Sequence, residues 1–414
     1  MSQIQFFLGA EENTSLDAVL EHSAMLPAWP PFDPRAVAFV TRFAQRLLID
    51  SQIRQFPELA ALGHWFRSAR LRDLAYNYPN EVADTLIVGR GLAFHLAPAN
   101  VDSVFMYSWL ISLLAGNTNI VRVSQKISPQ LSFLINVLRA VLQEEVGTAV
   151  GSRIVLLTYP HDEAITRAIS MRCMARVVWG GDATVATIRA IPLRPTAVEI
   201  CFPDRFSVAA IKSESILAAC DADLSRLAAA FYNDAFWFAQ QACSSPRLVN
   251  WIGSAESCAS ARSRFWNAVE LEVVRRDAEN TPAMGMARLA AAFEFAAAGL
   301  AHPYQLGSGV GFPTLLELEV PISDAIKEIH CGNGLFLEQR FDSLEQLAVQ
   351  LSDKEQTLAV HGFTRPEIKM LVHALGGRAL DRIVPIGEAL AFAPVWDGTD
   401  LFVFFTRSIS IPRV

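Results

Sequence analysis

Short apolar runs alternate with amphipathic segments between residues 85 and 190, and this alternation limits the folds open to the chain. Strand-like runs begin at Thr85, Asn119, Arg153 and Ala175. Each run is continuously apolar, which is typical of strands buried on both faces of a parallel sheet. The run from Thr85 to Leu96 is expected to form one strand. A second alternating block extends from residue 206 to about 364, so we predict an α/β fold.

The length of 414 residues predicts two or three domains at roughly 150 residues each. Residues 1–80 are expected to be helical. We predict a first domain over 1–205, formed by these helices and the first alternating block, and a second over 206–365 that carries Cys243. The segment 366–414 is expected to return to the first domain or to form an oligomer interface.

Composition excludes several classes of protein. Charged residues make up 19% of the chain, the formal charge is −7, and Lys and Arg are scattered, which argues against nucleic acid as a partner. The longest apolar run, 104–116, is shorter than the ~20 residues of a spanning helix. No basic segment of a signal peptide is evident at the N-terminus. High apolar content hints at an oligomer interface or an apolar substrate.

The cysteines show no spacing typical of a metal site. Cys173, Cys201, Cys220, Cys243, Cys258 and Cys331 lack any CxxC pair, so we expect reduced thiols in a cytoplasmic protein. The neighbours His330 and Cys331 have no second cluster with zinc spacing, and no metal is expected. No glycine-rich GxxxxGK[ST] loop is present, which argues against a phosphoryl transferase of that type.

The sequence around one cysteine is typical of a reactive thiol. Cys243 lies between Gln240-Gln241 and Ser244-Ser245-Pro246, a polar surrounding that fits a loop at a cleft. A reactive thiol needs an accessible, electropositive surrounding and backbone N–H groups that hold an oxyanion. The alternative is a buried structural thiol, which is the commoner role of a cysteine.

Polar and small residues follow three of the predicted strands. Asn100 could donate to an oxyanion, or be a turn residue after Pro98. Arg122 and Ser124 end the next strand and either face a ligand crevice or lie on the surface. Gly180-Gly181 joins a strand to a helix, where backbone N–H groups can bind a pyrophosphate, although most such turns are structural.

Five stretches occur in the order found in one family: residues 90–101, 108–124, 178–182, 238–246 and 381–398. Together they resemble the aldehyde dehydrogenase superfamily. They are most similar to its fatty-acyl reductases, which act on acyl-CoA or acyl-protein and include the bacterial luminescence reductase. The C-terminal stretch is typical of this reductase branch. The resemblance implies a Rossmann-type nucleotide-binding domain plus an α/β catalytic domain.

The resemblance also implies roles for individual residues. Cys243 matches the nucleophile and Asn100 the oxyanion amide. Arg122, with Ser124 and Gly180-Gly181, falls in the cofactor site, and Glu328 matches the glutamate that binds the nicotinamide ribose. Gln125 replaces an acidic residue that many NAD-preferring members use, so we expect NADPH, with NADH possible.

Where aldehyde-oxidising members carry a glutamate base, this chain has Cys201, with Glu199 two residues earlier as a substitute. The departure favours reduction over oxidation. The expected reaction reduces the thioester of an acyl-CoA or acyl-carrier protein to an aldehyde through an S-acyl cysteine. The alternatives are an aldehyde dehydrogenase that forms an acid and a non-catalytic scaffold. Expected partners are an acyl-activating or acyl-transferring enzyme and further copies of the chain.

Overall fold

The computed structural model describes residues 4–11, 14–98, 102–305 and 313–412, and the chain forms two compact units. The first unit combines Met1–Pro203 with Phe392–Val414, and the second is Asp204–Ala391. Residues 366–391 thus belong to the second unit, and residues 392–414 belong to the first.

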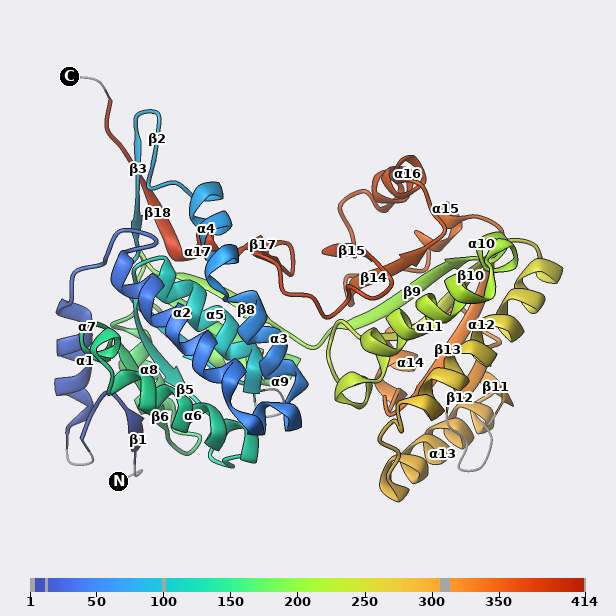
Figure 1. Cartoon of the computed structure of the whole chain (residues 1–414), viewed down its shortest axis with the longest axis horizontal. Helices are drawn as coiled ribbons and strands as arrows, with labels where there is room; N and C mark the ends of the chain where they lie inside the picture. The colour runs from blue at the N-terminus through green and yellow to red at the C-terminus, as the bar shows by residue number, and fades with distance from the viewer. Residues whose placement is uncertain (1–3, 12–13, 99–101, 306–312, 413–414) are drawn as a thin grey trace. The chain divides into compact units, whose positions relative to one another are not determined.

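In the described part of the first unit, six strands form a sheet that is parallel except at one edge (Figure 1). Their spatial order is β1 (Gln5–Leu8), β6 (Ile154–Thr158), β5 (Thr118–Arg122), β4 (Leu92–Leu96), β7 (Ala175–Trp179) and β8 (Val198–Phe202). Strands β4, β6 and β7 are buried along their whole length, as their continuous apolar runs predict. Strand β1 pairs antiparallel with β6 and lies in a region predicted to be helical.

The apolar run that begins at Thr85 forms two strands instead of one. Strand β3 (Thr85–Gly89) and strand β4 are separated at Gly91, whose φ of 114° favours glycine. Strand β3 pairs with β18 (Thr406–Ser410) and β2 (Glu81–Val82) in a separate antiparallel sheet. A bend at one glycine therefore moves the first half of the run out of the parallel sheet.

Helices cover both faces of the six-stranded sheet. Phe43, Trp109 and Leu134 belong to the core on one face, and Leu20, Ile169 and Val185 to the core on the other. The helices of this unit are α1 (Leu16–Met25), α2 (Pro34–Ile49), η1 (Ser51–Gln55), α3 (Pro57–Trp65), α4 (Ser68–Asn77), α5 (Asp102–Leu114), α6 (Pro129–Leu142), α7 (Glu145–Gly151), α8 (Glu163–Ser170), α9 (Asp182–Arg189) and α17 (Leu401–Phe405). A short hairpin of β16 (Val395–Trp396) and β17 (Thr399–Asp400) precedes α17.

The second unit repeats this plan around a larger sheet. In spatial order its described strands are β11 (Ala301–Gln305), β12 (Thr314–Leu318), β13 (Leu335–Phe341), β10 (Pro246–Ile252), β9 (Phe206–Lys212), β14 (Glu355–His361) and β15 (Arg382–Pro385). All of these pairings are parallel except that of β11 with β12. The amino ends of β9, β10, β13 and β14 therefore meet at the same edge of the sheet.

Two further cores lie on the two faces of this sheet. Phe231, Phe265 and Trp266 pack on one face, and Phe295, Ile326 and Leu371 on the other. The helices are α10 (Ser213–Ala218), α11 (Asp221–Ala235), η2 (Trp237–Gln240), α12 (Ala255–Arg275), α13 (Pro282–Ala297), α14 (Asp324–Ile329), α15 (Leu344–Leu347) and α16 (Arg365–Leu375). The predicted α/β class, with parallel sheets covered on both faces, is confirmed in both units.

Within the described ranges, none of the helices has the length and apolarity that crossing a membrane requires. The same ranges contain no cluster of His, Cys, Asp and Glu side chains suited to a metal ion.

Candidate active site

The first sheet has a topological switch point at the carboxyl ends of β4 and β7. The chain runs from β4 outward through β5 to β6, then returns to the other side of β4 to form β7 and β8. Open α/β sheets bind ligands at such a point, outside the carboxyl ends of the strands. Gly180 and Gly181 directly follow β7 at this edge, and Arg122 is the last residue of β5.

Gly181 leaves space at the beginning of helix α9. It is the N-cap of α9, and no side chain caps the first N–H groups of the helix. A Cβ at Gly181 would meet no heavy atom within 4 Å, whereas one at Gly180 would lie 3.1 Å from Thr184 Cγ2. The first turn of α9 thus offers uncapped backbone donors beside an open position, a suitable place for a phosphate group.

Arg122, which is predicted to bind the cofactor, is held in place by Tyr159. The Arg122 guanidinium lies 4.9 Å from the centroid of the Tyr159 ring, and its Nη2 donates to Tyr159 O at 3.2 Å. Its Nε is buried and has no hydrogen-bond partner among the residues that the structure describes. Ser124 Oγ instead accepts a hydrogen bond from Lys126 N at 3.2 Å, so in this structure Ser124 stabilises a turn.

Asn100, the predicted oxyanion amide, lies outside the described residues. Strand β4 ends at Leu96 and helix α5 begins at Asp102, so the position of Asn100 in the sequence is between the switch-point strand and the helix that follows it. Its predicted role stays a prediction.

Cys243 lies in the second unit, at the amino edge of the larger sheet. It occupies the turn between η2 and β10 and is half-buried. Its carbonyl oxygen accepts a hydrogen bond from Ser207 Oγ at 2.6 Å, and Ser207 Oγ in turn accepts one from Thr357 N at 3.2 Å. The backbone of Cys243 is thus attached to the first residues of β9 and β14, while its side chain is partly accessible.

The residues before Cys243 adopt an unusual backbone conformation. Phe238, Ala239 and Gln240 have φ values of 57°, 50° and 64°, in the left-handed region. Such a conformation costs a residue with a Cβ roughly 1–2 kcal/mol, and strained backbone of this kind clusters at functional sites. The sequence contains no signal for this turn, because none of the three residues is glycine or asparagine.

Arg247 supplies positive charge near the turn. Arg247 Nε donates to Gln240 O at 3.4 Å. Burial lowers the pKa of Arg247, whereas Asp204 and the sulfurs of Cys243 and Cys331 raise it. A cation at this edge favours a negative sulfur.

Most of the other thiols are in surroundings that keep them protonated. Burial raises the pKa of Cys173 to about 12 and that of Cys201 to about 11, and it also raises those of Cys258 and Cys331. The exposed Cys220 Sγ lies 3.0 Å from Asp223 Oδ2. Burial therefore makes Cys173, Cys201, Cys258 and Cys331 poor nucleophiles, since the thiolate is the reactive form.

Glu328 is exposed on helix α14, which a buried ion pair attaches to the sheet. Lys327 Nζ lies 2.7 Å from Glu355 Oε1 at the beginning of β14, and both side chains are almost fully buried. The pair fixes the helix that presents Glu328 and that leads into the turn before β13.

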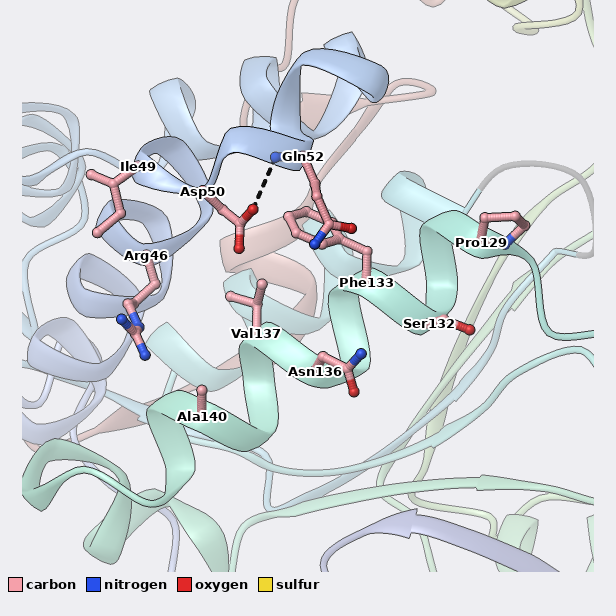
Figure 2. A pocket seen from close by; sticks show the side chains of 10 residues that line it. All are labelled: Arg46, Ile49, Asp50, Gln52, Pro129, Ser132, Phe133, Asn136, Val137 and Ala140. Carbon is pink, nitrogen blue, oxygen red and sulfur yellow. Dashed lines mark hydrogen bonds between the residues drawn. The ribbon is translucent and has the colours of Figure 1, made fainter.

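A separate groove of about 450 Å³ lies on the first unit (Figure 2). It is formed by the end of α2, the segment at Asp50–Gln52 and one side of α6. Its lining residues are Arg46, Ile49, Asp50, Gln52, Pro129, Ser132, Phe133, Asn136, Val137 and Ala140. None of the predicted site residues that the structure describes lines it.

A family model described as "Acyl-CoA reductase (LuxC)" matches residues 20–259, more than half of the chain and a range that includes Cys243. The chain belongs to the LuxC acyl-CoA reductase family. It is therefore an oxidoreductase, as the motifs predicted. No curated protein matches the sequence.

Solved structures similar to this LuxC-family chain are aldehyde dehydrogenases. An NAD-dependent aldehyde dehydrogenase from Sinorhizobium meliloti is 12% identical with a TM-score of 0.68, and the match covers 97% of this chain and 88% of that one. The aldehyde dehydrogenase KauB from Pseudomonas aeruginosa is 14% identical with a TM-score of 0.67, covering 95% and 88%. At such identities the likeness shows the fold alone, and it confirms the predicted aldehyde-dehydrogenase-like architecture.

The structure brings part of the predicted LuxC-family site together. Arg122, Gly180 and Gly181 share the carboxyl edge of one sheet, whereas Cys243 and Glu328 belong to the other unit. The sequence singled out the stretch 238–246 around Cys243, but not the left-handed conformation of Phe238–Gln240 or the cation Arg247. A basic residue four positions after the cysteine was the only available signal.

Proposed function

We propose that this LuxC-family chain reduces an acyl thioester to an aldehyde with NADPH, through an S-acyl intermediate on Cys243. The observation that carries the proposal is the half-buried Cys243, in a fixed turn beside the Arg247 cation. The acyl donor is an acyl-CoA or an acyl-carrier protein.

The residues of the chain would act in a fixed order. The Cys243 sulfur attacks the thioester carbonyl, the bond between the carbonyl carbon and the donor sulfur breaks, and the donor leaves as a free thiol. Asn100 and the backbone N–H of Cys243 donate to the oxyanion. When bound beside Arg122 and the beginning of α9, a nicotinamide cofactor would supply the hydride needed to reduce the S-acyl group to an aldehyde. Cys243 then leaves as the thiolate and is ready for the next donor.

The carboxyl edge of the first sheet fits a dinucleotide. Gly181 leaves room for a phosphate at the uncapped beginning of α9, and within the described ranges the Arg122 Nε has no hydrogen-bond partner. Arg122 is suited to a 2′-phosphate, since Gln125 rather than a carboxylate follows on the same loop. Proteins of similar fold have been solved in complex with NAP and in complex with NAD⁺, which supports a nicotinamide dinucleotide at this edge.

The surroundings of Glu199 support reduction over oxidation. An aldehyde-oxidising enzyme needs a base that activates water. Glu199 instead forms ion pairs with the buried Arg176 and with Arg189. Burial raises the pKa of Cys201 to about 11, so this thiol stays protonated near neutral pH and cannot accept a proton from water. Neither residue is therefore available as the base that would activate water.

We also propose that the chain forms homo-oligomers and receives acyl groups from an acyl-activating or acyl-transferring enzyme. Sedimentation of the purified protein tests the first proposal. Acyl transfer from a loaded carrier protein, compared with transfer from acyl-CoA, tests the second.

The central experiment loads the enzyme with a series of acyl-CoAs of graded chain length in the absence of NADPH. Peptide mass spectrometry should find the acyl group on Cys243, and added NADPH should release it as aldehyde. An acyl group on another cysteine, or release as a carboxylic acid, would refute the proposal. Cys331→Ala is the matched control, because this half-buried thiol lies near the same arginine.

A further inference from the structure

Two left-handed turns contact each other at the amino edge of the second sheet. The first is Phe238–Gln240, and the second is Gly332–Gly334, where Gly332, Asn333 and Gly334 have φ values of 69°, 60° and 82°. Glycine adopts this conformation readily, so the second turn suits its sequence. The first turn has no glycine and must be held by its surroundings.

Hydrogen bonds connect the two turns directly. Asn333 N donates to Ala239 O at 2.8 Å, and Gly334 N donates to Gln240 Oε1 at 3.0 Å. A Cβ at Gly332 would lie 2.5 Å from Gln241 Nε2, which shows how closely the turns pack. The loop before β13 thus supports the strained turn before Cys243.

The side chain of Gln240 connects the second turn with the first residue of β10. Gln240 is fully buried, and its amide has a partner at each end. Its Oε1 accepts from Gly334 N, and its Nε2 donates to Pro246 O at 2.9 Å. The second bond closes a loop from residue 240 to residue 246, and Cys243 is the middle residue of that loop.

We propose that Gln240 is a positioning residue, whose buried amide holds the loop that presents Cys243 to the acyl donor. The role rests on the proposed function of Cys243 as nucleophile. Gln240 does not touch the substrate; it acts by fixing the backbone on both sides of the cysteine. Misplacement of a reacting group by about 1 Å can reduce a rate roughly 100-fold, so a loss of this connection should be measurable.

The neighbouring Gln241 provides a matched control. It has the same side chain, but it is exposed, and its Nε2 donates to Cys331 O at 2.9 Å. The two glutamines differ in burial and in what they connect. Methionine has a similar length and no hydrogen-bonding amide, so Gln240→Met and Gln241→Met remove the same group at the two positions.

The first experiment measures alkylation of Cys243 by iodoacetamide, resolved by peptide mass spectrometry, with kcat and KM for acyl-CoA reduction. We expect Gln240→Met to slow alkylation of Cys243 and to lower kcat by about tenfold or more, with KM changed less than about twofold. Gln241→Met should change each value less than about threefold. Equal effects of the two variants, or a kcat of Gln240→Met within twofold of wild type, would overturn the proposal.

The second experiment uses Gln240→Glu and serves also if Gln240→Met does not fold. A protonated carboxyl group has a donor and an acceptor, as the amide has, whereas the ionised form has lost the donor to Pro246 O. The ratio of wild-type to variant alkylation rate should therefore be smallest where the introduced carboxyl group is protonated, and it should rise with pH as that group ionises. A ratio that does not change with pH would overturn the proposal.

These readouts separate the two proposals. Alkylation reports on the thiol whether or not the chain reduces acyl thioesters. If Cys243→Ala keeps full reductase activity, the proposed function fails, while slower alkylation of Cys243 in Gln240→Met still supports the positioning role.

Discussion

Both units are built on a parallel sheet with one antiparallel edge strand, yet their candidate residues lie at opposite ends of the strands. In the first unit Arg122 and Gly181 are at the carboxyl edge, where helices begin and their N–H groups are available. In the second unit Cys243 is at the amino edge, where helices such as α11 end and the helix dipole is negative.

The two edges therefore differ in which groups can bind or stabilise a negative charge. At a carboxyl edge the backbone itself binds an anion, so an open glycine and one arginine suffice. At an amino edge the negative ends of the helix dipoles disfavour a negative sulfur, so a cation such as Arg247 has to provide the positive charge. Side chains such as Ser207 and Gln240 hold the loop in place. The following predictions test this contrast.

Removal of the sulfur should have the largest effect. Cys243→Ala is expected to lower kcat by more than about 10⁴-fold, because no other group forms the acyl intermediate. Circular dichroism should show an intact fold, since the side chain is half-buried and the loop is held by its backbone. Aldehyde formation followed by NADPH consumption measures the effect. Undiminished turnover would show that Cys243, at the amino edge of the second sheet, is not the nucleophile.

Filling the open position at the carboxyl edge should weaken cofactor binding. Gly181→Leu is expected to raise KM for NADPH about tenfold or more, the equivalent of about 1.4 kcal/mol. A Cβ at Gly181 has no described heavy atom within 4 Å, so the added side chain begins in open space. Gly151→Leu is the control, since Gly151 at the end of α7 also has no heavy atom near its Cβ position. Similar effects at both glycines would argue against a phosphate at α9.

Loss of the Arg122 charge should separate the two cofactors. Arg122→Gln is expected to raise KM for NADPH about 10- to 100-fold, as a charge-assisted hydrogen bond contributes about 1.5–3 kcal/mol, and to leave KM for NADH almost unchanged. Steady-state kinetics with both nucleotides measure the shift. Equal losses with NADH and NADPH would contradict recognition of a 2′-phosphate by Arg122.

A buried carboxyl group should give the second unit a stability that falls with pH. Burial raises the pKa of Asp234 from 3.8 to about 7, against hydrogen bonds from Gly387 N and Ala389 N. The native state then binds more protons than the unfolded state, so this contribution is present below pH 4 and is lost as pH rises through about 7. Asp234→Asn should remove up to about 3–4 kcal/mol of this dependence. Urea unfolding followed by hydrogen exchange in α11 measures it.

A buried histidine should give the first unit the opposite dependence. Burial lowers the pKa of His95 from 6.5 to about 4, and its Nε2 lies 3.0 Å from Asn119 Oδ1. The unfolded state then binds more protons between pH 4 and 6.5, so stability rises with pH in that range by up to about 3 kcal/mol. Hydrogen exchange in β4 of wild type and His95→Gln measures the difference. A dependence that persists in the variant would assign it to another group.

Much of the candidate site could be predicted from the local sequence. Continuous apolar runs predicted buried strands, and the positions of Gly180, Gly181 and Arg122 just after such runs predicted the carboxyl edge of a parallel sheet. The break of the Thr85 run at Gly91 and the strand β1 were missed, because pairing with distant strands decided both.

By itself the sequence determined the α/β class, the motif order of a LuxC-family reductase and the one cysteine in a polar surrounding. These depend on residue type and short spacing, which a linear chain records. Only the tertiary structure decided that Phe238–Gln240 turns left-handed and that Gln240 spans from Pro246 to Gly334. Such features cost energy locally, and contacts between residues about 90 positions apart offset that cost, so no local pattern can reveal them.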